Sequence, residues 1–305
     1  MQKTNNQLKE KTEELFQQKE EIVTQKEEIE SQRDEIILQK IEIEKKNTSL
    51  TDSIHYALRI QEAMLPTNEM IASNLPEHFI LYKPRDIVSG DFYWFRQIKN
   101  YTFIAAADCT GHGVPGAFMS MLGISILNEI ITKRDLNPPN EVLDELRKRI
   151  KKSLHQKGQD GQTQDGMDIA MCVIDNESNE IQFSGAFNPM YVFRKSTIDN
   201  NYELIETKAD RMPIGVHPFD NKNFTSKTMK LQTNDTLYLF SDGYASQFGG
   251  EKSEKFKTRR LKNILLKIQN KNLLEQKEIL EAAFKEWQGN NEQVDDILLI
   301  GIRIK

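Results

Sequence analysis

The sequence has few cysteines and no long apolar run. Its only two cysteines, Cys109 and Cys172, stand far apart and match no metal-ligand spacing. Such isolated cysteines exclude a disulfide framework and fit a reducing compartment. No stretch of about 18 apolar residues is present, and the first residues lack the apolar core of a signal peptide. We therefore expect a cytoplasmic protein without membrane insertion.

The chain also lacks a strong charge of either sign. Its formal net charge is −5 at pH 7, whereas a nucleic-acid-binding protein normally carries a basic face. Nucleic acid is therefore not an expected partner. The composition changes along the 305 residues: Glu, Lys, Gln and Ile dominate residues 1–50, and apolar runs alternate with turns in the remainder. This predicts a helical segment followed by a globular domain large enough to bury a core.

Leucine or isoleucine recurs every seven residues in the N-terminal segment. The positions are Leu8, Leu15, Ile22, Ile29, Ile36, Ile43 and Leu50. This period predicts one seam of a left-handed coiled coil, and hence a homodimer. If these residues occupy heptad position a, glutamines such as Gln25 fill position d; if they occupy d, basic residues such as Lys26 fill a. In both cases alternate core layers are polar, so the register can change easily.

The repeat allows a passive dimerisation stalk or a signalling stalk. A single solvated helix is the third reading, and the unbroken apolar stripe argues against it. Apolar residues become denser in 53–66, which predicts packing against the globular domain. We therefore divide the chain into a coiled-coil helix (1–52), a linker or switch helix (53–66) and a globular domain (67–305). We expect residues 53–65 to couple the stalk to the functional site.

After Pro66 the pattern changes to short apolar and aromatic runs that are typical of strands. The predicted strands are Phe79–Tyr82, Asp91–Gln97, Thr102–Ala107, Ile169–Ile174, Ile181–Ser184, Tyr191–Phe193, Glu203–Ile205, Thr236–Phe240 and Ile297–Ile304. The predicted helices are Pro115–Ile131, Glu141–Leu154, Thr258–Ile268 and Leu273–Trp287. Strands in runs and helices in pairs indicate an α+β fold in which helices cover the sheet faces.

Acidic residues stand where predicted strands meet turns. They are Asp91, Asp108, Asp242 and the pair Asp295 and Asp296. Grouped carboxylates repel one another unless they are neutralised, and Mg²⁺ or Mn²⁺ prefers such oxygen ligands. Two ions of this kind could activate a water and hold a phosphoryl group. One Asp-Gly pair alone indicates only a turn, so the inference depends on the whole set.

Four motifs carry a family resemblance. They are Ser89-Gly90-Asp91-Phe92-Tyr93, Asp108-Cys109-Thr110-Gly111-His112-Gly113-Val114-Pro115-Gly116-Ala117, Ser241-Asp242-Gly243 and Asp295-Asp296-Ile297. In this order they resemble the metal-dependent protein phosphatases related to protein phosphatase 2C, and within them the SpoIIE-like branch. The resemblance covers residues 53–305. It implies an α/β/β/α sandwich of two antiparallel sheets flanked by helices, with two divalent ions at the sheet ends.

The resemblance also implies roles for the acidic residues. Asp91, Asp108 and the backbone carbonyl of Cys109 correspond to the ligands of one Mn²⁺ or Mg²⁺ ion. Asp108 would bridge to a second ion, which Asp242 and Asp295 complete. No expected carboxylate is missing, which argues against an inactive relative.

Other positions are secondary candidates. Asp296 and Asp168 are further metal or outer-sphere residues, although a strand-entry role suits Asp168 better. Arg85 and Asn188 are candidate substrate ligands, and Asn188 could instead cap a turn. The basic segment 252–260 is either a flap that attracts a phosphoprotein or a solvated helix start. His112 is interpreted as structural, because no His-x-x-x-His or Cys-x-x-Cys spacing supports zinc.

The expected reaction is hydrolysis of phosphoserine or phosphothreonine in a partner protein by metal-activated water. No Cys-x5-Arg loop offers a cysteine nucleophile. The resemblance points to bacterial signalling and to a phosphorylated anti-sigma-factor antagonist as a candidate substrate. Two alternatives stay open. Absence of metal-dependent turnover would favour an interaction protein with a non-catalytic phosphatase-like domain, and activity confined to small phosphoesters would favour a small-molecule hydrolase.

Overall fold

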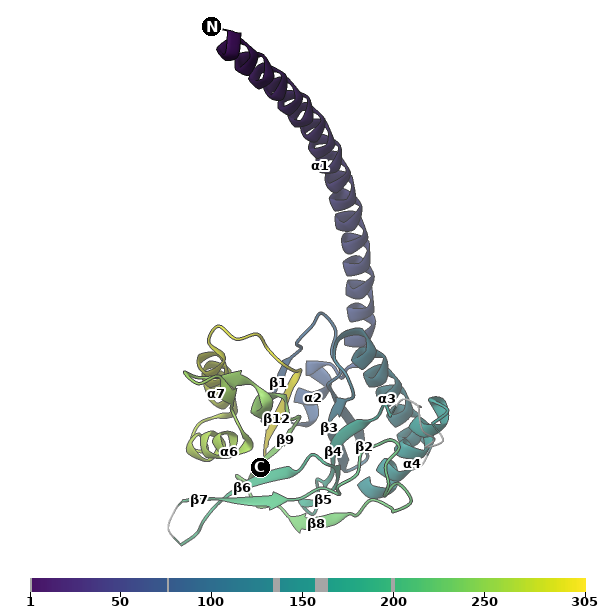
Figure 1. Ribbon diagram of the computed structural model, residues 1–305. Coiled ribbons are helices and arrows are strands. Elements are labelled where there is room, and N and C mark those ends of the chain that lie inside the picture. The colour runs from purple at the N-terminus through teal and green to yellow at the C-terminus, as the bar shows by residue number, and fades with distance from the viewer. Residues whose placement is uncertain (1, 76, 134–137, 157–163, 199–200) are drawn as a thin grey trace. The chain divides into compact units, whose positions relative to one another are not determined.

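The computed structural model describes residues 2–75, 77–133, 138–156, 164–198 and 201–305. Contacts divide the chain into two compact units, Met1–Ile54 and His55–Lys305. Helix α1 (Gln2–Met64) runs without a break through the first unit and into the second (Figure 1). The long N-terminal helix is therefore confirmed. The apolar residues of its seven-residue repeat are 57% to 66% exposed, so the coiled coil itself stays a prediction.

The second unit is built on two five-stranded sheets with antiparallel pairing. One sheet has the spatial order β1 (His78–Lys83), β12 (Ile297–Arg303), β9 (Thr236–Phe240), β6 (Met190–Lys195), β7 (Tyr202–Thr207). The other has the order β2 (Phe92–Ile98), β3 (Tyr101–Cys109), β4 (Met167–Asp175), β5 (Glu180–Ala186), β8 (Lys227–Lys230). A short hairpin adds β10 (Phe248–Gly249) and β11 (Glu254–Lys255).

The sheets pack face to face because side chains alternate along each strand. In β4, Ala170 and Cys172 belong to the cluster between the sheets, where they join Leu239 and Ile300 of the opposite sheet. Their neighbour Met171 belongs to a different cluster, on the outer face. One strand therefore supplies two cores, as expected for the central layers of a sandwich.

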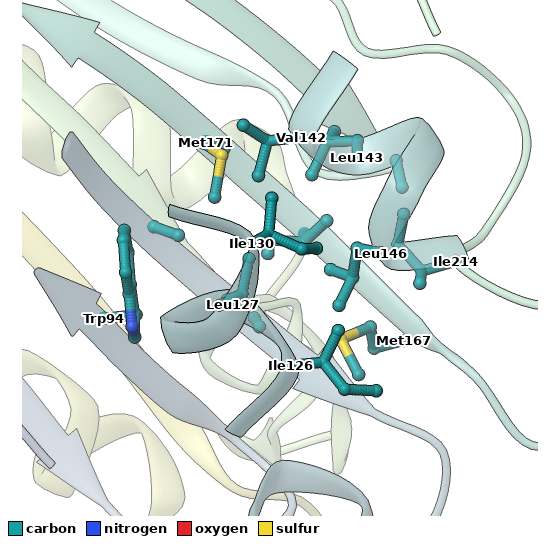
Figure 2. Close-up of a cluster of buried hydrophobic side chains, with 14 of the residues drawn as sticks. Trp94, Ile126, Leu127, Ile130, Val142, Leu143, Leu146, Met167, Met171 and Ile214 are labelled. Atoms are coloured by element: carbon teal, nitrogen blue, oxygen red, sulfur yellow. The ribbon is translucent and has the colours of Figure 1, made fainter. Parts of the chain in front are cut away.

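Helices cover both outer faces. α3 (Gly113–Lys133) and α4 (Pro139–Ser153) lie on the sheet of β4, and Figure 2 shows their apolar side chains packed around Met167 and Met171. α6 (Thr258–Lys267) and α7 (Leu273–Gln288) lie on the other sheet. The predicted α/β/β/α sandwich is confirmed. Within α3, Gly113–Thr132 is apolar enough to span a membrane, but more than half of it is buried, as in a core helix.

A few elements differ from the predictions. Strand β2 begins at Phe92, so Asp91 precedes it, and α3 begins at Gly113 rather than at Pro115. Helix α2 (Asn68–Asn74), the four-residue α5 (Gly243–Ser246) and β8 were not predicted. Strand β8 is a mostly exposed edge strand, so its sequence carries no alternating apolar pattern.

Candidate metal centre

Strand ends from both sheets carry the predicted acidic residues. Asp91 immediately precedes β2, and Asp108 is the next-to-last residue of β3. In the other sheet, Asp242 follows β9, and Asp295 stands just before β12. Because β2 pairs with β3 and β9 pairs with β12, each sheet brings its two acidic positions to neighbouring strand ends. The predicted residues therefore lie in two pairs, one at the strand ends of each sheet.

Hydrogen bonds join the acidic loops of the two sheets. Ser241 Oγ donates to Asp91 Oδ2 at 2.5 Å and accepts from Leu298 N at 3.0 Å. This serine stands after β9, beside Asp242, so it connects one sheet's loop to a carboxylate of the other. The sequence analysis included Ser241 in a motif but assigned it no role. A hydroxyl beside a motif aspartate was the only available signal.

Asp296 accepts hydrogen bonds from the backbone of the loop that precedes Asp91. Its two carboxylate oxygens accept from Arg85 N and Gly90 N, both at 2.7 Å. This carboxylate holds the loop that precedes β2, which agrees with a secondary role. The guanidinium of Arg85 donates to Val294 O at 3.1 Å, and Val294 lines the cavity described below.

Glycines allow these loops to approach each other. A Cβ at Gly90 would lie 2.5 Å from Gly111 O, which real Cβ atoms essentially never do. A Cβ at Gly243 would lie 1.9 Å from Asp296 O. The close contact between loops therefore requires glycine at both positions.

The carboxyl groups are close enough to influence each other's ionisation. Burial, and then the charge of Asp108, raises the pKa of Asp91, which is only 1% exposed. Burial, followed by the charges of Asp242 and Asp295, raises the pKa of Asp108 to about 8. Burial is also the main cause that raises the pKa of Asp295. A bound cation would oppose these shifts, because it stabilises the ionised carboxylates.

A cavity of about 400 Å³ opens beside these groups. Asp108, Asp168 and Asp295 line it together with His112 and His217. Asp168 pairs with Asp108 across the β3–β4 ladder, and burial raises its pKa to about 7. The structure therefore brings Asp168 to the same site as the predicted ligands.

The donor set fits a hard divalent cation. Among the described residues, no group of three or more His, Cys, Asp or Glu side chains is arranged so that it could hold a metal ion. Mg²⁺ needs fewer protein ligands, since it keeps several waters and usually takes one or two carboxylates plus substrate phosphate. Besides the two histidines, the cavity lining offers the carboxylate oxygens of Asp108, Asp168 and Asp295. Such donors suit Mg²⁺ and Mn²⁺ rather than softer metals.

The remaining candidates differ in where they lie, and of them His112 lines the cavity. Asn188 is not among the described residues that line the cavity; it is 7% exposed, and its Nδ2 has no partner among the described residues. His112 Nδ1 is 2.7 Å from Asp86 Oδ2, and both side chains are nearly half exposed. In the basic segment, Arg260 pairs with Glu254 at 2.7 Å and α6 begins at Thr258. The helix-start interpretation describes that segment better than a free flap.

One buried glutamine connects α1 to the acidic loop. Gln61 is 2% exposed, and its Nε2 donates to Ser89 O at 2.6 Å and to Ser120 Oγ at 2.8 Å. Ser89 N donates back to Gln61 Oε1 at 3.1 Å. Ser89 is two residues before Asp91, and Ser120 belongs to α3. The sequence analysis did not single out Gln61. Its position as an amide side chain within the apolar-rich end of the helix was the feature that could have indicated a buried polar contact.

Comparisons with known proteins agree with this architecture. The family model described as stage II sporulation protein E (SpoIIE) matches residues 99–305. The SiaA-PP2C domain of Pseudomonas aeruginosa is 32% identical, with a TM-score of 0.75, and the match covers 85% of this chain and 98% of that domain. No curated protein matches significantly.

Two more distant structures share the fold. The first contains the PP2C phosphatase domain and a regulatory fragment of SpoIIE from Bacillus subtilis. It is 19% identical, with a TM-score of 0.57, and the match covers 75% of this chain and 63% of that chain. The second is RsbX in complex with magnesium, which is 12% identical, with a TM-score of 0.52 and coverage of 75% and 94%. At these identities the likeness concerns the fold alone.

Proposed function

The chain belongs to the SpoIIE family and is a protein serine/threonine phosphatase, and we propose that it dephosphorylates a regulatory protein in bacterial signalling, using two divalent ions. The observation that carries this proposal is the meeting of oxygen donors from both sheets at one end of the sandwich. Two contacts link the two halves of that site directly: Ser241 is bonded to Asp91, and Asp296 accepts from Gly90 N.

The proposed ligands divide into two sets. Asp91, Asp108 and the carbonyl of Cys109 would hold one ion, and Asp108, Asp242 and Asp295 would hold the other. Mn²⁺ or Mg²⁺ bound there would lower the pKa of a water and polarise the phosphoryl group. The magnesium named for RsbX supports a hard cation. Ser241 and Asp296 would position Asp91 and its loop through the hydrogen bonds described above.

Asp108→Asn tests this proposal. The variant keeps the size of the side chain and removes the carboxylate shared by both ions. We expect loss of Mn²⁺-dependent hydrolysis of both an aryl phosphate and a phosphoserine peptide. Asp175→Asn is the matched control, because Asp175 lies at the opposite end of the same β3–β4 ladder. Full activity in Asp108→Asn, or wild-type turnover that persists in EDTA, would refute the metal site. Activity on the aryl phosphate alone would instead favour a small-molecule hydrolase.

We also propose that α1 regulates the site. Gln61 binds both backbone polar groups of Ser89, so a movement of this part of the helix would displace the loop that carries Asp91. This contact supports the expectation that residues 53–65 couple the stalk to the site. Deletion of residues 1–50 should change both the oligomeric state and the turnover. If neither changes, the stalk does not regulate the enzyme.

The proposal also names a substrate, a compartment and a partner for the coiled coil. A phosphorylated anti-sigma-factor antagonist in the cytoplasm is the candidate substrate, and a second copy of this chain is the expected partner of the coiled coil. The family assignment supports the substrate class, and the exposed apolar repeat supports the dimer. Release of inorganic phosphate from a purified phosphorylated antagonist, compared with an unrelated phosphoprotein, would test the substrate.

A further inference from the structure

We propose that two copies of this chain pair through α1 in parallel and in register, with the leucine and isoleucine stripe at heptad position a. The inference rests on the proposed dimer and adds its orientation and register. Both matter for function, because a parallel pair brings the two copies of Gln61 to the same end of the stalk, whereas an antiparallel pair places them at opposite ends.

The first observation is the exposed stripe. Its members, from Leu8 to Leu50, are each more than half exposed on a helix of 63 residues. Exposed apolar side chains gain free energy when a partner removes them from water. A second copy offers an identical stripe of the same length and spacing.

The second observation is the charge on either side of the stripe. With the stripe at a, five consecutive g positions carry glutamate: Glu14, Glu21, Glu28, Glu35 and Glu42. The e positions between them all carry basic residues: Lys19, Lys26, Arg33 and Lys40. In a parallel, in-register pair, each g residue faces the e residue five positions later in the partner. This sets Glu21 against Lys26, Glu28 against Arg33 and Glu35 against Lys40, once on each side of the dimer.

Other arrangements bring like charges together. In an antiparallel pair, g faces g and e faces e, which places glutamates beside glutamates and lysines beside lysines. In a parallel pair with the stripe at d, position a would hold Lys26, Arg33 and Lys40, each facing its own copy in the core. Burying such like charges is strongly unfavourable. With the stripe at a, the d layers hold neutral glutamines such as Gln25 and Gln32, which can hydrogen-bond across the pair.

These charged groups are available to a partner. Within the described part of α1, neither Glu21 nor Glu28 forms an ion pair with a neighbouring side chain. Lys26 approaches Glu30 at 3.9 Å, with the lysine side chain 75% exposed. Such long, exposed pairs within one helix contribute little and can be exchanged for contacts with a second chain.

Single cysteines in the full-length chain test the orientation. Leu15→Cys and Ile43→Cys lie at equal distances on either side of Ile29, and the native Cys109 and Cys172 are buried. Treated separately with a short bis-maleimide, each variant should form a covalent homodimer. In an equimolar mixture of differently tagged variants, we expect few cross-links between the two. An antiparallel pair centred on Ile29 would give the opposite result, namely cross-links mainly between the two variants, and would overturn the proposal.

Charge reversal tests the register independently. The triple variant Glu21→Lys, Glu28→Lys and Glu35→Lys should raise the dimer dissociation constant at least about tenfold, since six opposite-charge pairs become like-charge pairs. Adding Lys26→Glu, Arg33→Glu and Lys40→Glu should restore dimerisation. An unchanged dissociation constant in the triple variant would refute the register. Sedimentation of the wild type separates the two levels of the proposal: a monomer refutes the dimer itself, and a dimer with the wrong cross-links refutes only its geometry.

Discussion

Replacing Gln61 with leucine tests the link between α1 and the metal centre. The new side chain is of similar size, so packing is largely kept, while three hydrogen bonds to Ser89 and Ser120 are lost. Ser120 Oγ lies 3.2 Å from Ser89 O and 2.9 Å from Ala117 O, so these two carbonyls share its single hydroxyl hydrogen. The amide N–H of Ser89 is left without a partner at a residue that is 0% exposed, where water cannot replace the glutamine.

The expected loss follows from these contacts. Each hydrogen bond contributes about 1 kcal/mol net, and an unsatisfied buried donor costs about 1–3 kcal/mol. We therefore expect the free energy of unfolding to fall by about 2–4 kcal/mol. Because Ser89 is two residues from Asp91, the loop should also lose its alignment, and the affinity for Mn²⁺ should fall.

Urea denaturation in EDTA measures the first quantity, and calorimetric titration with Mn²⁺ measures the second. His55→Leu is the control, because it places leucine at an exposed position of the same helix. Wild-type values for both quantities would refute the reasoning. Lower stability with unchanged Mn²⁺ affinity would show that Gln61 supports the fold without positioning the site.

Three further predictions concern the acidic loops. Ser241→Ala removes the hydrogen bond to Asp91. We expect the Mn²⁺ affinity, measured by calorimetry, to fall about tenfold, as it does when a metal ligand loses an outer-sphere partner. An unchanged affinity would contradict this role. Gly90→Ala places a Cβ 2.5 Å from Gly111 O, so its thermal midpoint should fall by several degrees relative to the wild type; an unchanged midpoint would contradict the close approach of the loops. In EDTA, the pKa of Asp108, raised from 3.8 to about 8, makes the folded state bind more protons than the unfolded state. Stability should therefore fall as pH rises from 5 to 8, and Mn²⁺ should remove this slope; a flat melting profile in EDTA would contradict the prediction.

Much of the fold could be predicted from local patterns. Strand β9 was predicted with its observed bounds, Thr236–Phe240, because a fully buried apolar run bounded by polar residues is a strong signal. The long α1 followed from its seven-residue period. Polar or short elements such as β8 and α2 were not predicted, since their residues carry no periodic apolar pattern.

The site was predictable to a smaller extent. Aspartates at strand ends were recognisable because they interrupt apolar runs beside glycines, and the structure gathers Asp108, Asp168 and Asp295 around one cavity. Asn188 was chosen from its loop motif, yet it is absent from the described lining of that cavity. A motif identifies a turn, but the direction in which its side chain points depends on what packs around it.

The sequence by itself determined most of the elements, the family and the acidic set, because periodicity and motifs are properties of neighbouring residues. Only the tertiary structure decided how those acids are held. The bond from Ser241 to Asp91 spans 150 positions, that from Arg85 N to Asp296 spans 211, and Gln61 reaches Ser120 across 59. Contacts at such separations form only when both sheets and their helices have packed, and no local pattern specifies which polar group will meet which.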